Sequence, residues 1–401
     1  MYSIPSSRYT CPNWLQAEWS RVFLRTWLFG AHSSQLPDVG SFVRLRFGRY
    51  DIALVRQEDL TVRAFHAVCQ HRGTPLCARD AGRVRSLVCP YHLWEYALDG
   101  ALRSAPGAEL SAPALAAVSL SEIPCEERLG FVWFRFTDQG PTLEAHLDPV
   151  AEAIDGYRPE AFRLAQQSNI EMKANWKAVL DANNESYHLR SLHPGLANIL
   201  DPSRVQDEAL GMHSGSRIPL GEGLASSDGA PTEATRQILR SLGVEPMPGT
   251  CDEIPGAIAA AFARELSACG VSLPRSLPLH FKRQFAVFPN VQLNFTPLHL
   301  EVYREWPHPT DPGQSRFEEI SYVRPFRAPA QPAHRAGPHG SFSAGEILDA
   351  DLDISTRVQQ GLASGALEQV RFTTRESNAA HFHRVLTDFV QSADASAPGS
   401  A

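Results

Sequence analysis

The chain has 401 residues, of which 43% are hydrophobic and 20% charged, a composition typical of a globular protein long enough for two packed domains. Its net charge of -7 and its lack of any Lys/Arg-rich run argue against nucleic acid or an anionic membrane as a partner. The sequence shows no signal-peptide pattern at its N-terminus and no apolar stretch of membrane-spanning length, so we expect a cytoplasmic protein.

The first part of the chain predicts a short helix followed by a small antiparallel β domain. Apolar residues recur at roughly helical spacing between 13 and 27, and Asn13 is available as the N-cap. From Ser41 the pattern changes to short β-type runs separated by polar residues, and we expect this β domain to end near Pro149. The predicted strands cover 42–47, 52–55, 62–65 and 131–134.

Two loops between these strands each combine one cysteine with one histidine, Cys69 with His71 and Cys89 with His92. Zinc also accepts two Cys and two His, but each loop of such a site usually carries like ligands. A mixed pair on each loop is what a Rieske [2Fe-2S] centre needs, because both Cys bind one iron and both His bind the other. The pattern therefore predicts an electron-transfer cluster, with a structural zinc site or buried thiols beside surface histidines as the alternatives. The remaining cysteines have no framework spacing, so we expect reduced thiols at Cys11, Cys77, Cys125, Cys251 and Cys269.

The second part of the chain is mixed. A helical stretch is predicted over 176–192, then a polar region rich in Gly and Pro to about Pro255, and a final helical section over 344–390. Strands followed by helices, with no βαβ alternation, predict an α+β domain. The strands are expected at 284–288, 291–295 and 318–323.

A second candidate metal site lies in the first of these helices, at Glu185, His188 and His193. Glu185 and His188 are expected to share a helix face. His188 and His193 lie about 140° apart around an ideal helix, so both reach one ion only if the helix unwinds between them. Pro194 and Gly195 directly afterwards favour such an ending. Two histidines and one carboxylate make the facial triad of a non-haem Fe(II) oxygenase. The alternative is that His188 and His193 are structural residues that bind no metal, as we expect of the other histidines.

Three separated motifs resemble the α subunits of Rieske non-haem iron ring-hydroxylating oxygenases. Both cluster loops, at 69–73 and 89–100, are similar to that family's signature, and Asn-Trp-Lys at 175–177 resembles its lead-in to the iron motif. Leu93 stands where the family usually has Gly, so we expect this loop to be less free to adopt a positive φ angle. The resemblance implies an α+β chain, with an N-terminal all-β Rieske domain and a C-terminal helix-grip (Bet v 1-like) catalytic domain built on an antiparallel sheet. The expected divisions are 1–40, a helical segment packing on the catalytic domain; 41–150, the Rieske [2Fe-2S] domain; 151–390, the catalytic mononuclear iron domain; and 391–401, a disordered tail.

The same resemblance implies which residues hold each cofactor. The family's ligand Asp stands eight residues before a Gln-x-Gly-Leu string, which begins here at Gln359 and points back to Asp351, with Asp349 and Asp353 as competitors. Glu185 is implied to be a bridge for electron transfer, hydrogen-bonding an iron-ligating His on one side and a cluster-ligating His on the other. The implied ligands are Cys69, His71, Cys89 and His92 for the [2Fe-2S] cluster, and His188, His193 and Asp351 for the mononuclear iron.

The implied activity is that of a terminal oxygenase, an oxidoreductase that uses O2 and electrons from NAD(P)H, delivered by a separate reductase or ferredoxin. Its substrate would be an aromatic or related small organic molecule. Glu rather than Asp at position 185 supports an alternative, a monooxygenase or oxidative demethylase of a methylated or quaternary amine. A more distant alternative is an electron-transfer Rieske protein without oxygenase activity. The family also implies a head-to-tail homotrimer or (αβ)3 assembly, with no nucleic acid or membrane partner.

Overall fold

The computed structural model describes residues 1–401 except 109, 223–228 and 393–401, so most of the expected disordered tail lies outside the described residues. The chain divides into two compact units, which we describe separately. The β unit comprises Trp19–Asp148 and Pro159–Ala161, and the mixed unit comprises Met1–Glu18, Pro149–Arg158 and Phe162–Ala401. Within the described part of the chain, no helix is both long enough and apolar enough to cross a membrane.

The β unit is built from three small antiparallel sheets. The largest has the strand order β10-β5-β4-β3-β6, and the others are β11-β12-β2 and β7-β8-β9. One apolar cluster gathers buried side chains between Phe42 and Leu120 and includes Phe65, Tyr96, Cys69 and Cys89, so the two predicted loops are anchored in a common core. The strands are β2 (Leu28–His32), β3 (Ser41–Phe47), β4 (Tyr50–Arg56), β5 (Val62–His66), β6 (Ala81–Arg83), β7 (Leu87–Val88), β8 (Glu95–Tyr96), β9 (Leu102–Ser104), β10 (Glu122–Ile123), β11 (Cys125–Arg128) and β12 (Phe131–Phe134), with one helix, α2 (Ala112–Ala116).

The mixed unit contains an eight-stranded sheet in the order β14-β15-β16-β17-β18-β19-β13-β20. Neighbouring strands are antiparallel except β13 and β20, which run parallel. Because successive side chains of a strand point to opposite faces, polar Gln292 and Asn294 share one face while Leu293 and Phe295 share the other. The strands are β13 (Arg163–Met172), β14 (Gln206–Leu210), β15 (His213–Pro219), β16 (Phe281–Val287), β17 (Val291–Phe295), β18 (His299–Pro307), β19 (Ser315–Val323) and β20 (Ala333–Pro338); β1 (Tyr2–Pro5) pairs separately with β21 (Gln369–Phe372).

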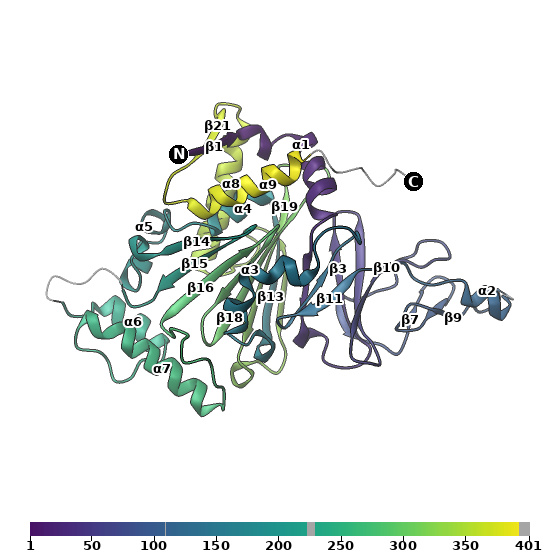
Figure 1. Cartoon of the computed structure of the whole chain (residues 1–401), viewed down its shortest axis with the longest axis horizontal. Helices are drawn as coiled ribbons and strands as arrows, with labels where there is room; N and C mark the ends of the chain where they lie inside the picture. Colours follow the sequence, from purple (N-terminus) through teal and green to yellow (C-terminus); the bar gives the residue numbers. More distant parts are fainter. Residues whose placement is uncertain (109, 223–228, 393–401) are drawn as a thin grey trace. The chain divides into compact units, whose positions relative to one another are not determined.

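Helices pack against this sheet, and Figure 1 shows α4, α8 and α9 gathered on one side of it. Val179 of α4 and Leu348 and Leu352 of α8 share an apolar cluster with Ile170 and Phe317 of the sheet. The helices α6 and α7 contribute to a separate apolar cluster. The helices are α1 (Pro12–Glu18), α3 (Leu143–Asp155), α4 (Trp176–Asn183), α5 (Leu189–Leu192), α6 (Glu233–Ser241), α7 (Ile254–Ala268), α8 (Glu346–Ala363) and α9 (Ser377–Gln391).

The fold is α+β, as predicted, but several elements differ from the sequence-based expectation. The helix expected over 176–192 is two helices, α4 and α5, and the section over 344–390 is two helices separated by strand β21. The polar region before Pro255, for which we predicted no helix or strand, contains β14, β15 and α6. The opening helix ends at Glu18 and continues as one π-helical segment, Trp19–Phe23. Long-range pairing explains these differences, since β21 is stabilised by β1 from the far end of the sequence.

Candidate iron sites

The two Cys/His loops of the β unit are built alike. In each loop the backbone N–H four residues after the cysteine donates to the cysteine carbonyl, from Gly73 to Cys69 at 2.9 Å and from Leu93 to Cys89 at 3.1 Å. Both donors have positive φ angles, 78° at Gly73 and 58° at Leu93. Leu93 therefore adopts the left-handed conformation that we expected it to resist, because the loop's hydrogen-bonding pattern requires it, at the cost of backbone strain.

The loops place the two thiols inside and the two imidazoles outside. Cys69 and Cys89 are 2% and 1% exposed, whereas His71 is exposed and His92 is half-buried. The two imidazole centroids are 4.7 Å apart. The structure thus brings together all four residues predicted to hold the cluster.

The surroundings of the thiols suit an iron–sulfur cluster. Burial alone would raise the pKa of Cys89, but hydrogen bonds from the backbone N–H groups of Tyr91 and His92 outweigh it and lower that pKa, which favours the ligating thiolate. The Tyr96 hydroxyl lies 3.3 Å from Cys69 Sγ and accepts the Gln70 N–H at 3.0 Å, so its own hydrogen is left for the sulfur. Hydrogen bonds to sulfur are one of the features that set the potential of such clusters.

The imidazoles also fit this role. Nδ1 of His92 is buried and has no hydrogen-bond partner among the described residues, a costly state for a polar atom unless it binds a ligand. Trp94 stacks on the His71 ring with centroids 4.7 Å apart and an interplanar angle of 13°, which holds that ring in place. Two buried thiols and two imidazoles fit the Rieske ligand set.

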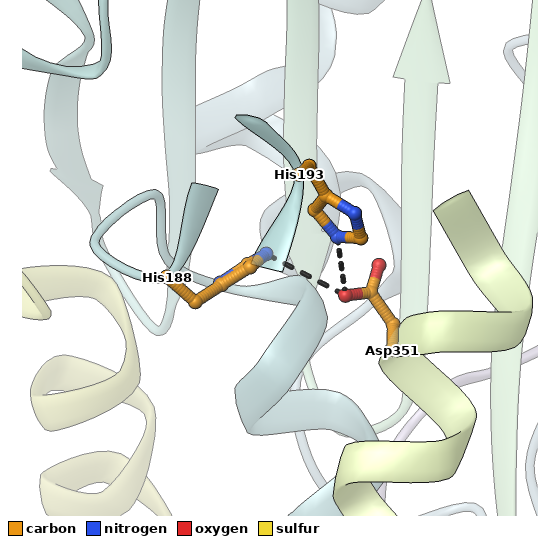
Figure 2. A group of neighbouring side chains, drawn as sticks. All are labelled: His188, His193 and Asp351. Atoms are coloured by element: carbon orange, nitrogen blue, oxygen red, sulfur yellow. Dashed lines mark hydrogen bonds and ion pairs between the residues drawn. The ribbon is translucent and has the colours of Figure 1, made fainter. Parts of the chain in front are cut away.

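In the mixed unit, His188, His193 and Asp351 converge, as Figure 2 shows. Their potential ligand atoms all lie within 4.8 Å of one another. Nε2 of His193 is 2.7 Å, and Nε2 of His188 3.6 Å, from the same carboxylate oxygen, Oδ1 of Asp351. Three atoms on one face of an octahedron lie roughly 3 Å apart when the metal–ligand bonds are about 2 Å long, so this set fits one ion. Burial raises the pKa of Asp351 against the opposing effect of the His193 hydrogen bond.

The competing acids near Asp351 are engaged elsewhere. Asp349 accepts hydrogen bonds from the Ser343 hydroxyl and, at 2.9 Å, from the Ala344 N–H at the start of α8. Asp353 lies 2.8 Å from Nε2 of His339. Since successive helical residues point in different directions, only Asp351 of these three reaches the histidine pair.

Glu185 and His188 lie in the turn between α4 and α5, so the expectation that they share a helix face was wrong. The Glu185 carboxylate accepts the backbone N–H groups of Tyr187 and His188, which starts a new turn and ends the helix. The same carboxylate lies 2.5 Å from Nδ1 of His188. An ionised carboxylate only accepts, so Nδ1 carries the hydrogen and Nε2 is left with a free lone pair for a metal. Burial lowers the pKa of His188, but Glu185 and Asp351 outweigh it and the pKa is raised.

Buried polar contacts join α4 to α8 and to α1. The Asn175 side chain caps α4 by accepting the Lys177 N–H, and the Asn175 N–H donates to Oε1 of Gln359 at 3.0 Å. Nζ of Lys177 lies 2.7 Å from Oε1 of Glu18, and both side chains are fully buried. Gln359 is thus a positioning residue that joins the helix preceding His188 to the helix that carries Asp351.

Several residues near these sites were not anticipated or were assigned another role. Tyr96, which contacts Cys69, was missed although it lies in the second cluster motif. Glu18 was also missed; it is the carboxylate partner that the buried Lys177 requires. Tyr187, which lies between Glu185 and His188 in the sequence, is 54% exposed. Asp181, another missed residue, binds the Tyr9 hydroxyl at 2.6 Å. A cavity of about 370 Å³ adjoins this region; Asp181, Glu185, His188, Val358 and Phe372 are among its lining residues.

Two family models match the chain. The model described as "Ring hydroxylating alpha subunit (catalytic domain)" matches residues 159–392, and that described as "Rieske [2Fe-2S] domain" matches residues 26–116. The chain is therefore a Rieske-type protein with an attached catalytic domain. It belongs to the ring-hydroxylating α-subunit family, whose cofactors are a Rieske [2Fe-2S] cluster and a mononuclear iron.

Curated relatives include enzymes acting on quaternary amines and on an arene. The chain is 35% identical over 200 residues to the glycine betaine monooxygenase oxygenase subunit of Chromohalobacter salexigens, a match covering 50% of this chain and 45% of that protein. It is 32% identical over 206 residues to the carnitine monooxygenase oxygenase subunit of Escherichia coli K12, covering 51% and 55%. It is 34% identical over 188 residues to the large oxygenase component of the naphthalene 1,2-dioxygenase system of a Ralstonia species, covering 44% and 42%. The matches thus span about half the length of these relatives.

Solved structures share the fold across nearly the whole chain. The quaternary ammonium Rieske monooxygenase CntA superposes with a TM-score of 0.73 at 20% identity, covering 97% of this chain and 95% of that one. Naphthalene 1,2-dioxygenase with bound indole superposes with a TM-score of 0.70 at 20% identity, covering 97% and 92%. At this level of identity, the likeness establishes the architecture alone.

Proposed function

We propose that this chain is the terminal oxygenase component of a Rieske oxygenase system and acts as a monooxygenase on a methylated or quaternary amine. The observation that carries the oxygenase assignment is the convergence of His188, His193 and Asp351 in a chain that also contains the two Cys/His loops. An electron-transfer Rieske protein would have no need of this second site. When bound, the mononuclear iron activates O2 with electrons supplied by the cluster.

The amine substrate class rests on the relatives and on Glu185. Glycine betaine and carnitine monooxygenase subunits are among the curated proteins that this chain resembles. These similarities support oxidation of a quaternary amine more strongly than hydroxylation of an arene. The second candidate is hydroxylation of an arene, supported by the similarity to the naphthalene 1,2-dioxygenase component. Both candidates use the same ligand set.

The proposed roles of the residues follow from the geometry. Cys69, His71, Cys89 and His92 would hold the cluster, and His188, His193 and Asp351 would hold the iron, which would supply the chemistry of O2 activation. Glu185 keeps the Nδ1 proton of His188 in place and so directs Nε2 toward the metal. The electrons come from NAD(P)H through a separate reductase or ferredoxin.

We further propose a head-to-tail homotrimer, or an (αβ)3 complex, in which Glu185 of one subunit meets His92 of the next. Glu185 and His188 line a cavity that is also lined by the 45% exposed Val358, which supports access to this side of the iron site by a neighbour. Co-expression of a Cys89→Ser chain with a His188→Ala chain tests the arrangement, because mixed rings contain junctions where an intact cluster faces an intact iron site. Activity is expected in mixed rings and in neither parent. A fully active monomer, or inactive mixed rings, would contradict it.

The function itself is tested by product analysis under 18O2. The purified chain, loaded with iron and supplied with reductase and NADH, is incubated with glycine betaine, carnitine and a panel of aromatic compounds, and products are identified by mass spectrometry. We expect 18O-dependent oxidation of a quaternary amine. Labelled products from arenes alone would favour the second candidate, and no O2-dependent product from a protein with both centres filled would contradict the oxygenase assignment for these substrates.

A further inference from the structure

One face of the eight-stranded sheet carries a group of polar side chains on neighbouring strands. In β17 and β18, Asn294 pairs with Glu301, and in β18 and β19, Tyr303 pairs with Glu319. Paired residues of an antiparallel sheet project to the same face, and Glu301 and Tyr303 are two residues apart on one strand. All four side chains therefore share one face, while the intervening Val302 is fully buried on the other.

This face lies beneath α4, the helix that precedes His188, and α8, the helix that carries Asp351. Gln292 donates from Nε2 to the carbonyl of Leu180 in α4 at 3.2 Å, and Gln284 donates to the carbonyl of Asn183 at its end. On the other side, Tyr303 packs against the apolar cluster that contains Leu348 and Leu352 of α8, one before and one after Asp351 on that helix. The polar group thus sits between the two helices that lead to His188 and Asp351.

The group is acidic, because Glu301 and Glu319 both lie on this face. Burial raises the pKa of Tyr303, and the charges of Glu301, Glu319 and Asp351 raise it further, so three carboxylates act on this ring. Burial raises the pKa of Glu319, which is 7% exposed, so this carboxyl group is harder to ionise until a cation lies beside it. Opposing charge comes from Lys282, whose Nζ is 4.0 Å from Glu301, and from Arg335, which lowers the pKa of Glu319.

Asn294 supplies an independent sign of a ligand. It is 4% exposed, and its Nδ2 donor is buried with no hydrogen-bond partner among the residues that the structure describes. A buried, unpaired donor costs free energy and is rare unless a ligand or water satisfies it. Its pairing with Glu301 places this donor on the same face as the acidic group.

An aromatic face completes the arrangement. The ring of Tyr303 lies 5.4 Å, centroid to centroid, from that of Phe317, at an interplanar angle of 55°. Aromatic faces attract quaternary ammonium ions, and nearby carboxylates strengthen that attraction without requiring hydrogen bonds that such ions do not donate. A zwitterion with a trimethylammonium group and a carboxylate would match both the acidic group and the Asn294 amide.

Resting on the oxygenase function proposed above, we propose that Glu301, Glu319 and Tyr303 form the subsite for the substrate's quaternary ammonium group, and that Asn294 donates to its carboxylate. This assigns the sheet face beneath α4 and α8 as the substrate-recognition surface of the mixed unit. The charge on the substrate, rather than its shape alone, then determines binding.

The test is equilibrium binding by calorimetry to the iron-loaded protein without reductant, so that no turnover is needed. Glycine betaine is compared with 3,3-dimethylbutanoate, which has the same shape and carboxylate but a neutral quaternary carbon. We expect the wild-type protein to prefer glycine betaine by roughly tenfold. Glu301→Gln and Glu319→Gln should each reduce this preference, and Tyr303→Leu should reduce it where Tyr303→Phe does not. Equal binding of the two compounds by the wild-type protein would overturn the proposal.

Two further comparisons separate charge from packing. Glu171→Gln removes an equal charge from an exposed position on β13 and should leave the preference unchanged. Asn294→Leu should weaken glycine betaine and 3,3-dimethylbutanoate alike but leave choline, which has no carboxylate, unaffected; unequal losses for the two carboxylates would reject the role of Asn294. If the protein oxidises arenes but shows no preference for the cation, the subsite is wrong and the oxygenase function stands. If it prefers the cation but consumes no O2 productively, the function is wrong and the subsite stands.

Discussion

The two candidate iron sites are assembled in opposite ways. The cluster residues come from two neighbouring loops of similar build, each closed by its own backbone hydrogen bonds. The mononuclear site joins residues as far apart in sequence as His193 and Asp351, with a separation of 158 positions. The first is therefore a local feature that tolerates changes elsewhere in the fold, whereas the second exists only while α4 and α8 are held together.

The largest effect is expected from Asp351→Ala, which separates the two sites. Removing the anionic ligand leaves two neutral imidazoles, so the mononuclear iron should be lost and product formation abolished while the visible spectrum of the cluster is retained. Metal analysis and absorbance on the same sample measure both. Asp349→Ala is the matched control and should keep both centres; iron loss in that variant alone would show that the wrong acid was assigned.

Glu185→Gln should have the next largest effect. The amide keeps the length of the side chain but loses its charge, so the Nδ1 hydrogen of His188 is held less firmly and the electron path is weakened. We expect both metals to be retained and single-turnover electron transfer to slow by about 10–100-fold. Glu171→Gln serves as the control. A rate equal to that of the wild type would show that Glu185 has no part in the transfer.

A smaller effect in the cluster unit is predicted for Tyr96→Phe, which removes the hydroxyl beside Cys69 Sγ. A hydrogen bond of about 1 kcal/mol corresponds to roughly 40 mV for a one-electron couple, so the reduction potential should fall by about that amount. Protein-film voltammetry measures it directly. Tyr91→Phe, at a 57% exposed position, should leave the potential unchanged. An unaltered potential in Tyr96→Phe would mean that the hydroxyl does not bond the sulfur.

The smallest effect concerns Leu93, which occupies in the second loop the left-handed position that Gly73 holds in the first. Leu93→Gly should relieve backbone strain, and the leucine is 58% exposed, so little packing is lost. We expect the free energy of unfolding of the cluster-loaded protein to rise by up to about 1 kcal/mol, measured by denaturant titration. Leu93→Ala should bring no such gain. A clear loss of stability in the glycine variant would show that Leu93 makes contacts that outweigh the strain.

The same contrast explains what the sequence could predict. Residue types and spacing predicted the four candidate cluster residues and the His188–His193 pair, because those patterns are local. The carboxylate required a family resemblance, since nothing near Asp351 in the sequence distinguishes it from Asp349 or Asp353 until α8 is folded. We expected the helix to unwind between His188 and His193, but the break comes before His188, where the Glu185 carboxylate accepts the backbone N–H of that residue, and α5 lies between the two histidines.

Partners that are distant in sequence account for what could not be predicted. The ion pair of Lys177 with Glu18, and the strand pairing of β1 with β21, depend on segments that no local pattern connects. The alternation of Gln292 and Asn294 with apolar neighbours was visible in the sequence, yet which face would be covered by α4 and α8 depends on tertiary packing.

The most direct measurement of the central claim, that one chain holds two iron centres of different kinds, is Mössbauer spectroscopy of the protein reconstituted with 57Fe. We predict two signals from the inequivalent irons of a Rieske cluster and a third from a high-spin mononuclear Fe(II), with cluster and mononuclear areas in a ratio of about two to one, and selective loss of the third in Asp351→Ala. Cluster signals alone in the fully loaded wild-type protein, or a third signal that survives in Asp351→Ala, would contradict the claim.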